Sequence, residues 1–119
     1  MVRVMIAEDS PATRMVLKDA LEIGHHEVVA EAIDGIETLE KFGKTNPDIL
    51  LLDVAMPKKD GISALEEIMS FNPNAKIIMI TADENFSTIH KSSEVGAQAY
   101  IVKPFNFDDV LKAITMALN

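Results

Sequence analysis

Five short apolar runs recur along the chain, and a longer segment of helical periodicity follows each one. The runs are rich in Ile, Val and Leu, and we predict strands at Arg3–Ala7, Glu27–Ala32, Ile49–Asp53, Lys76–Thr81 and Ala99–Val102. In the segments between them apolar residues return at helical spacing, as Leu17 and Leu21 do. Strands that alternate with helices without long linkers form a parallel sheet with helices on both faces. The sequence therefore predicts an α/β protein with a doubly wound, five-stranded parallel sheet.

Cap and turn residues indicate where these elements begin and end. Ser10, which precedes a proline, predicts the start of the first helix, and Gly24 is predicted to close it as the residue after the C-cap. Gly35 and Gly61 each follow an aspartate and are expected to form turns. The third run, Ile-Leu-Leu-Leu, holds no polar residue before its final aspartate. Such a run is typical of a central strand that is buried on both faces.

The composition excludes several classes of protein. The 119 residues fit one domain, and 48% hydrophobic with 25% charged residues is ordinary for a folded globular chain. The absence of cysteine excludes disulfides, thiolate zinc sites and thiol nucleophiles. The net charge of 11 − 19 = −8 would repel a phosphate backbone, so direct nucleic-acid binding is not expected. We find no secretory signal and no apolar stretch of roughly 20 residues, so the expected location is the cytoplasm, without membrane insertion.

Polar residues gather where the predicted strands end. In open α/β sheets, chemistry takes place in the crevice beyond the carboxyl ends of the strands. Glu8 and Asp9 follow the first strand, Asp53 ends the third, Thr81 ends the fourth and Lys103 follows the fifth. Three carboxylates, a hydroxyl and an amine are therefore expected to meet at one edge of the sheet.

This set of side chains suits one type of reaction. Carboxylates in one crevice repel one another unless a cation neutralises them, and oxygen ligands favour Mg²⁺, with Mn²⁺ as the second choice. A hard cation beside a nucleophilic carboxylate and a lysine can support phosphoryl transfer to an aspartate. Asp53 is the best nucleophile because it ends the central strand. Glu8 and Asp9 would hold the metal, while Lys103 and Thr81 would contact phosphoryl oxygens.

The ordered set of motifs resembles the CheY-like receiver domain of two-component response regulators over essentially the whole chain, residues 1–119. Each motif is weak by itself, whereas their order and spacing together are specific. The matching residues are Glu8 and Asp9, Asp53, Met56-Pro57-Lys58-Lys59-Asp60-Gly61, Thr81 and Ala82, Gly96 and Ala97, Tyr100, and Lys103-Pro104-Phe105. The resemblance implies a flavodoxin-like (βα)5 fold with strand order 2-1-3-4-5.

The resemblance also implies roles for individual residues. Asp53 would accept a phosphoryl group from a phosphohistidine on a sensor histidine kinase or phosphotransfer protein, with Mg²⁺ required. The metal ligands would be Glu8, Asp9, Asp53 and the backbone carbonyl of Ala55. Residues at phosphate-binding positions are Lys103, Thr81 and Ala82, and the peptide bond between Lys103 and Pro104 would be cis.

Two further sets of residues match positions that regulate receivers. Thr81 and Tyr100 match the switch pair, in which the hydroxyl moves toward the phosphoryl group and the aromatic ring swings inward. This pair would change a surface formed by the fourth helix, the fifth strand and the fifth helix, where a downstream protein binds. Ala55 and Asp83 match positions that tune the lifetime of the phosphoryl group. Ala55 offers no polar group to orient water, so we expect slower self-dephosphorylation than in an Ala55→Asn variant.

The resemblance implies a signalling module, as in chemotaxis or a phosphorelay, that catalyses only its own phosphorylation and dephosphorylation. Three alternatives compete with this hypothesis. A phosphohydrolase with an aspartyl-phosphate intermediate would place a second acid where Ala55 stands. A flavodoxin-like nucleotide binder would need a Gly-, Ser- or Thr-rich phosphate loop after the first strand, where Glu8 and Asp9 stand instead. A receiver-shaped module that works without phosphate stays open.

Other conspicuous residues have structural explanations. His25 and His26 lack a third ligand at metal-binding spacing and are expected to be exposed. Four of the seven methionines are expected to fill gaps in the core: Met15, Met69, Met79 and Met116.

Overall fold

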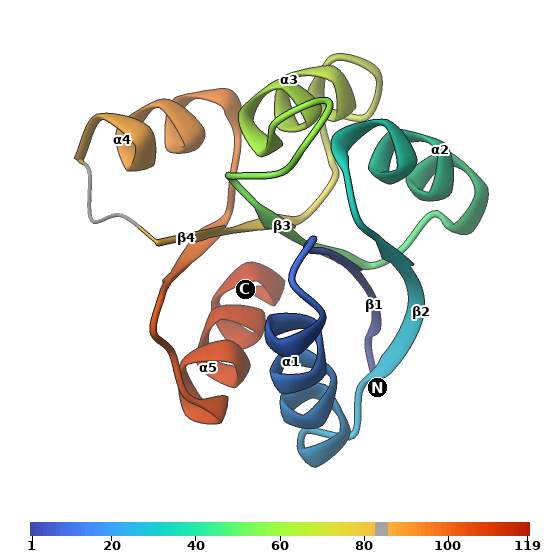
Figure 1. Ribbon diagram of the computed structural model, residues 1–119, viewed down its shortest axis with the longest axis vertical. Helices are drawn as coiled ribbons and strands as arrows, with labels where there is room; N and C mark the ends of the chain where they lie inside the picture. The colour runs from blue at the N-terminus through green and yellow to red at the C-terminus, as the bar shows by residue number, and fades with distance from the viewer. Residues whose placement is uncertain (83–85) are drawn as a thin grey trace.

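The computed structural model describes residues 1–82 and 86–119 and contains one parallel sheet of five strands (Figure 1). The strands lie in the order β2-β1-β3-β4-β5. Their bounds are Arg3–Ala7 for β1, Glu27–Ala32 for β2, Ile49–Asp53 for β3, Ile77–Thr81 for β4 and Ala99–Val102 for β5. The predicted strand positions are confirmed, except that β4 begins one residue later than expected. The predicted fold class and strand order are confirmed as well.

Helices cover both faces of this sheet. Figure 1 shows α1 and α5 on one face and α2, α3 and α4 on the other. Their bounds are Pro11–Ile23 for α1, Gly35–Thr45 for α2, Gly61–Phe71 for α3, Phe86–Val95 for α4 and Phe107–Leu118 for α5. Within the described part of the chain, no helix combines the length and the apolarity needed to cross a bilayer.

The centre of the sheet is the most buried part of the molecule. Every residue of β3 and β4 is buried, as the apolar run of β3 predicts. Side chains that alternate along the strands separate the core into two layers. Leu51 and Ile78 pack with α1 and α5, whereas Leu50 and Ile77 pack with α2 and α3. Asp53 therefore lies at the end of a strand that is held in place by the apolar core on both faces.

The start of α1 is as predicted, but its end is not. The Ser10 hydroxyl accepts a hydrogen bond from the Thr13 backbone N–H at 3.3 Å, which confirms the N-cap. Gly24 is itself the C-cap and has φ = −82°, so it does not use the left-handed region open to glycine. His25 adopts that conformation instead, with φ = 59°. The prediction for Gly24 was wrong because Asx and His residues also tolerate a positive φ.

Gly35 and Gly61 do not form turns; each is the first residue of a helix. Asp34 and Asp60 cap these two helices. A Cβ atom on Gly61 would lie 2.0 Å from the carbonyl oxygen of Asp53. Glycine is required here because the start of α3 approaches the end of β3 more closely than a side chain permits.

The burial of three side chains differs from the prediction: two methionines expected in the core and one histidine expected to be exposed. Met15 and Met116 are each 65% exposed, so the prediction that they fill the core was wrong. Both lie on surface-facing sides of amphipathic helices, where the hydrophobic stripe is broader than the buried face. His26 is only partly exposed, and its Nδ1 atom is buried, which corrects the expectation that it is solvated.

Candidate functional site

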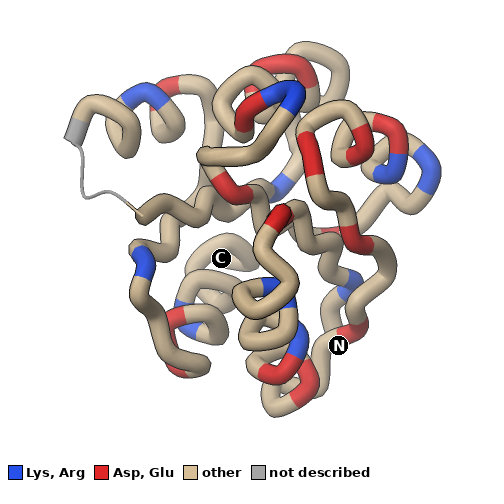
Figure 2. The backbone as a smooth tube through the Cα atoms, in the orientation of Figure 1, with Lys and Arg blue, Asp and Glu red and all other residues tan. Residues whose placement is uncertain are grey.

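Three carboxylates meet where β1 and β3 end. Figure 2 shows acidic segments near one another at the carboxyl ends of these two strands. One carboxylate oxygen each from Glu8, Asp9 and Asp53 lies within 4.8 Å of the other two. Glu8 is 0% exposed and Asp53 is 2% exposed, whereas Asp9 is exposed. The topology thus places two buried negative charges side by side, because β1 and β3 are neighbours in the sheet.

The backbone after β1 fixes the Glu8 side chain. The Glu8 N–H donates to the Ala32 carbonyl at 2.9 Å, and Glu8 Oε2 accepts a hydrogen bond from the Ser10 N–H at 3.0 Å. The other oxygen, Oε1, lies 3.0 Å from Lys103 Nζ, but no hydrogen bond of acceptable geometry reaches this buried atom among the described residues. A buried carboxylate oxygen without a hydrogen bond is costly.

Lys103 joins the two buried carboxylates. Its ammonium lies 3.4 Å from Asp53 Oδ2 as well as 3.0 Å from Glu8 Oε1. Burial alone would lower the pKa of Lys103, but the contact with Glu8 and the charges of Asp53 and Glu8 outweigh burial and raise this pKa above its ordinary value. Lys103 is therefore a cation in the crevice. The peptide bond that follows it, to Pro104, is cis, as expected.

Asp53 also accepts a backbone hydrogen bond. The Ala55 N–H donates to Asp53 Oδ1 at 3.1 Å, which folds the β3–α3 loop back over the end of β3. The Gly61 N–H donates to the Val54 carbonyl at 2.8 Å and holds the far end of the same loop. This loop carries the Ala55 carbonyl, which is expected to bind a metal together with the three carboxylates.

Thr81 and Lys103 reach the crevice on adjacent strands. Thr81 is 4% exposed, and its carbonyl accepts a hydrogen bond from the Lys103 N–H at 2.7 Å. Ala82 follows directly and is exposed. Tyr100 lies away from this group: it pairs in register with Met79 and is 38% exposed. The structure therefore brings Thr81 to the site but leaves Tyr100 at the surface, and Asp83 lies outside the described residues.

These residues fit a hard divalent cation. All side-chain donors are carboxylate oxygens, which Mg²⁺ and Mn²⁺ prefer over the nitrogen and sulfur ligands of zinc. Glu8 Oε1, the buried oxygen without a hydrogen bond, is free to act as a metal ligand. Asp9 is exposed beside it, so a cation can enter from solvent.

The comparisons with known proteins agree with this geometry. The family model of the response regulator receiver domain matches residues 4–115. The chain belongs to this family. It is 42% identical to the chemotaxis protein CheY of Bacillus subtilis over 98% of both chains. It is 40% identical to the transcriptional regulatory protein PdtaR of Mycobacterium tuberculosis over 98% of this chain, but only 57% of that protein.

The fold of this receiver is also close to solved structures. It superposes with a TM-score of 0.95 and 33% identity on a chain from the CheX-CheY-BeF3-Mg complex of Borrelia burgdorferi, covering 99% of this chain and 90% of the other. Receivers of two-component systems are signalling modules, and the chain is a CheY-like member. The match with a longer transcriptional regulator shows that the same receiver fold occurs with additional segments.

Sequence reasoning missed several residues around the crevice of this receiver. The Arg14 guanidinium contacts the backbone after β1, and the exposed Lys58 ammonium lies 3.6 Å from Asp34 Oδ2. No sequence motif predicts these contacts. The one available signal is the position of Arg14 four residues after the N-cap Ser10, because this spacing returns a helical side chain to the face of the cap.

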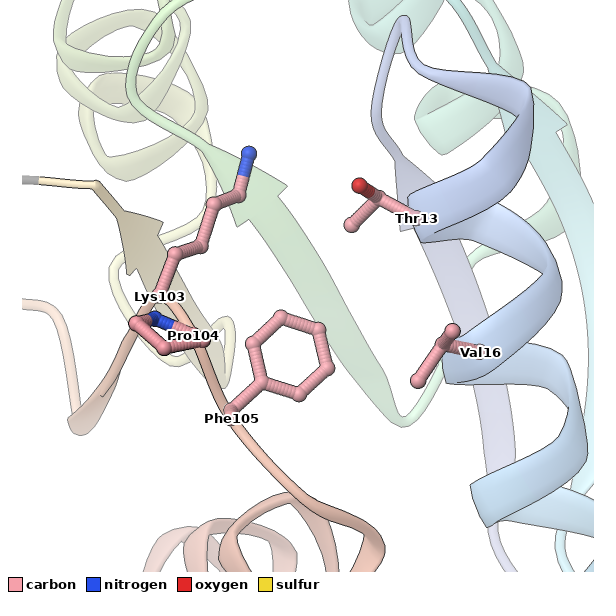
Figure 3. Close-up of a pocket in the computed structure, with 5 residues that line it drawn as sticks. All are labelled: Thr13, Val16, Lys103, Pro104 and Phe105. Atoms are coloured by element: carbon pink, nitrogen blue, oxygen red, sulfur yellow. The ribbon is translucent and has the colours of Figure 1, made fainter.

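A pocket of about 400 Å³ opens beside Lys103, between α1 and the connection from β5 to α5. Figure 3 shows the Phe105 ring facing the Thr13 and Val16 side of α1, while the Lys103 amine extends toward the end of β3. Five residues line it: Thr13, Val16, Lys103, Pro104 and Phe105. An apolar opening therefore adjoins the charged crevice.

Proposed function

We propose that this receiver, as a single domain over residues 1–119, accepts a phosphoryl group on Asp53 from a phosphohistidine of a partner protein in the cytoplasm. The observation that carries the proposal is the convergence of Asp53, Glu8, Asp9 and Lys103 at the end of the central strand. Ordinary structural carboxylates are paired or solvated. Here two nearly unexposed carboxylates share a single lysine.

The transfer exchanges one phosphorus bond for another. An Asp53 carboxylate oxygen attacks the phosphorus, an O–P bond forms, and the N–P bond to the donor imidazole breaks. The electron pair of the broken bond stays on the imidazole nitrogen, which then takes a proton. The product is an acyl phosphate. In dephosphorylation, water attacks the phosphorus, the O–P bond to Asp53 breaks, and inorganic phosphate leaves with the carboxylate restored.

The surrounding residues stabilise charge on the transferring group. Lys103 is a cation held in the crevice and would pair with a phosphoryl oxygen once Asp53 is modified. Thr81 and Ala82, at the end of the neighbouring strand, would donate to the remaining oxygens. Glu8, Asp9, Asp53 and the Ala55 carbonyl would hold Mg²⁺, or Mn²⁺. The bound ion neutralises charge that develops on the phosphoryl oxygens.

Phosphorylation would act on a distant surface through Thr81 and Tyr100. The added charge of about −1.5 to −2 would attract the Thr81 hydroxyl. Tyr100 is 38% exposed on β5 and lines a surface hollow with Lys112 and Met116 of α5, so an inward rotation of its ring would alter this face. A downstream protein would bind the surface of α4, β5 and α5. The complex in which the Borrelia relative was solved contains CheX as a protein partner.

The donor protein must contact the rim of the crevice. A sensor histidine kinase or phosphotransfer protein can bring its phosphohistidine to Asp53 only over the surrounding loops. The apolar pocket between α1 and Phe105 lies at this rim. Ala55 and Asp83 would then set how long the phosphoryl group persists, and Ala55 favours slow hydrolysis compared with Ala55→Asn.

Intact-protein mass spectrometry tests the chemistry. Wild type, Asp53→Asn and Asp108→Asn are incubated with acetyl phosphate, with Mg²⁺ and with EDTA. Asp108 is a matched control because it forms an exposed ion pair with Lys112, in α5 and outside the crevice. We expect one phosphoryl adduct on wild type and on Asp108→Asn with Mg²⁺, and none on Asp53→Asn or in EDTA. An adduct that persists on Asp53→Asn would contradict the assignment of the phosphoacceptor.

A further inference from the structure

The Arg14 side chain holds the backbone of the acidic pair. Arg14 belongs to α1, yet its guanidinium turns back to the segment that precedes the helix. Its Nη1 donates to the Glu8 carbonyl at 2.8 Å and lies 3.4 Å from the Asp9 carbonyl. Its Nε lies 3.3 Å from Glu31 Oε1 on β2. One planar group therefore connects α1, β2 and the residues that follow β1.

The segment from Glu8 to Ser10 is held at each of its ends by other contacts. The Glu8 N–H is bonded to Ala32 of β2, and the Ser10 carbonyl accepts the Arg14 N–H at 2.9 Å. Between these two anchors, the contacts to the Glu8 and Asp9 carbonyls come from the Arg14 guanidinium. Because the orientation of the Glu8–Asp9 peptide affects where the Asp9 Cα–Cβ bond points, these contacts also bear on the direction of the Asp9 side chain.

We propose that Arg14 is a positioning residue for the cation site: it orients the Glu8 and Asp9 backbone so that both carboxylates face Asp53. This inference rests on the proposed function, since it assumes that these carboxylates bind Mg²⁺. Arg14 is suited to the task because a guanidinium has several donors in a fixed plane and can bind carbonyls and Glu31 at once. A lysine has the same charge but lacks this planar arrangement.

The direction in which the Mg²⁺ affinity changes when Arg14 is removed tests the proposal. A cation near the site repels Mg²⁺, so if Arg14 acted only through its charge, its removal would tighten Mg²⁺ binding. If Arg14 positions the ligands, its removal weakens binding. Lys18 provides the matched control, because its Nζ lies 3.1 Å from Oε2 of the same Glu31. Lys18 thus shares the ion pair and the charge with Arg14, but the contacts to the two carbonyls belong to Arg14.

The experiment is calorimetric titration of the 119-residue chain with MgCl₂ alone, without a phosphodonor. Far-UV circular dichroism confirms that each variant is folded. We expect Arg14→Gln to lower the Mg²⁺ affinity about tenfold, as loss of an outer ligand contact does at other metal sites. Arg14→Lys should lower it about threefold, since the charge persists without the planar donors. Lys18→Gln should leave the affinity unchanged or slightly higher.

The possible results separate the two proposals. Unchanged or tighter Mg²⁺ binding by Arg14→Gln, or equal weakening by Lys18→Gln, would overturn the positioning role. If Arg14→Gln does not fold, Arg14→Lys decides the question, and wild-type affinity in that variant overturns the proposal. Absence of Mg²⁺ binding by wild type would instead refute the cation site of the proposed function.

Discussion

The acidic residues at the carboxyl edge of the sheet fall into two groups with opposite effects on stability. Asp34 and Asp60 each precede a helix and accept a backbone N–H of its first turn, at 2.7 and 2.8 Å. Glu8, Asp9 and Asp53 instead converge on one another. The first group satisfies helix donors and adds stability, whereas the second concentrates like charges. Acidic residues at the same edge therefore either cap a helix or join a cluster of carboxylates.

α1 shows how the two groups are kept apart. Its N-cap is Ser10, not the adjacent Asp9, so the Asp9 carboxylate is not used at that cap. A neutral hydroxyl serves the helix while the charged side chain joins the cluster. The difference between capping carboxylates and clustered carboxylates leads to four predictions, which follow in order of decreasing expected effect.

Gly61→Ala should have the largest effect. Gly61 follows the capping residue Asp60 and packs against the backbone of Asp53, so it lies between the two groups of acidic residues. The new Cβ would lie 2.0 Å from the Asp53 carbonyl oxygen, so β3 or α3 must shift. We expect a loss of stability on the order of 3 kcal/mol by chemical denaturation, together with slower phosphorylation of Asp53. The control is Gly43→Ala in α2, where the new Cβ has no atom within 4 Å apart from its chain neighbours and the nearby backbone of its own helix. It should gain about 0.5–1 kcal/mol.

Lys103→Met should destabilise the metal-free protein by about 2 kcal/mol, because it leaves Glu8 and Asp53 buried without their shared cation. This figure lies below that of a fully buried pair, since a quarter of the Lys103 side chain is exposed to solvent. Mg²⁺ should restore more stability to the variant than it adds to wild type. Thermal unfolding in EDTA and in Mg²⁺ measures both effects, and Lys112→Met is the exposed control. If Mg²⁺ stabilised wild type and Lys103→Met equally, the Lys103 ammonium would not be the charge that neutralises Glu8 and Asp53 in the metal-free protein.

Asp9→Ala and Asp60→Ala should change the stability of the metal-free protein in opposite directions. Asp60→Ala removes a cap and should cost about 1 kcal/mol. Asp9→Ala removes a repelling charge and should raise stability by about 0.5 kcal/mol, with weaker Mg²⁺ binding. Denaturation in EDTA compares the two variants. A destabilised Asp9→Ala would mean that this carboxylate is structural as well.

The smallest expected effect is a pH dependence at Asp34. The hydrogen bond from the Glu37 N–H, helped by the Lys58 ammonium and opposed by burial, lowers the pKa of Asp34. Its contribution is complete above the unfolded-state pKa of about 3.9 and is lost as the pH falls through the lower folded-state pKa. Asp34→Asn keeps a capping side chain without this titration. The stability difference between the two proteins should therefore shrink on acidification below about pH 4; a constant difference would exclude this coupling.

The elements and the edge of the sheet that bears the site could be predicted from sequence because both depend on local patterns. An uninterrupted apolar run identifies β3, and a polar residue at its end places Asp53 in the crevice. Cap residues such as Ser10 act on the next turn of the chain, so they too are visible locally. The family resemblance added the strand order and the cis bond before Pro104, which no local pattern reveals.

The predictions that failed depend on contacts between distant segments. Met15 and Met116 follow helical periodicity, but only the packing of α1 and α5 decides which apolar side chains stay exposed. The need for glycine at Gly61 arises from the approach of the Asp53 carbonyl, not from a turn. The contacts of Arg14 join three elements at once. Apart from the spacing between Ser10 and Arg14, the sequence contains no information on these contacts.

The wide separation of the crevice residues along the chain has a consequence for folding. Lys103 is separated from Asp53 by 50 residues, and Glu8 lies near the opposite end of the chain. Contacts of such long range form only after most loop-closure entropy has been lost, so the crevice assembles late. A partly folded or nicked chain that lacks β5 has no lysine in the crevice. On the proposed function, the chain would become able to accept a phosphoryl group only once folding is complete, and a chain without β5 would not accept one.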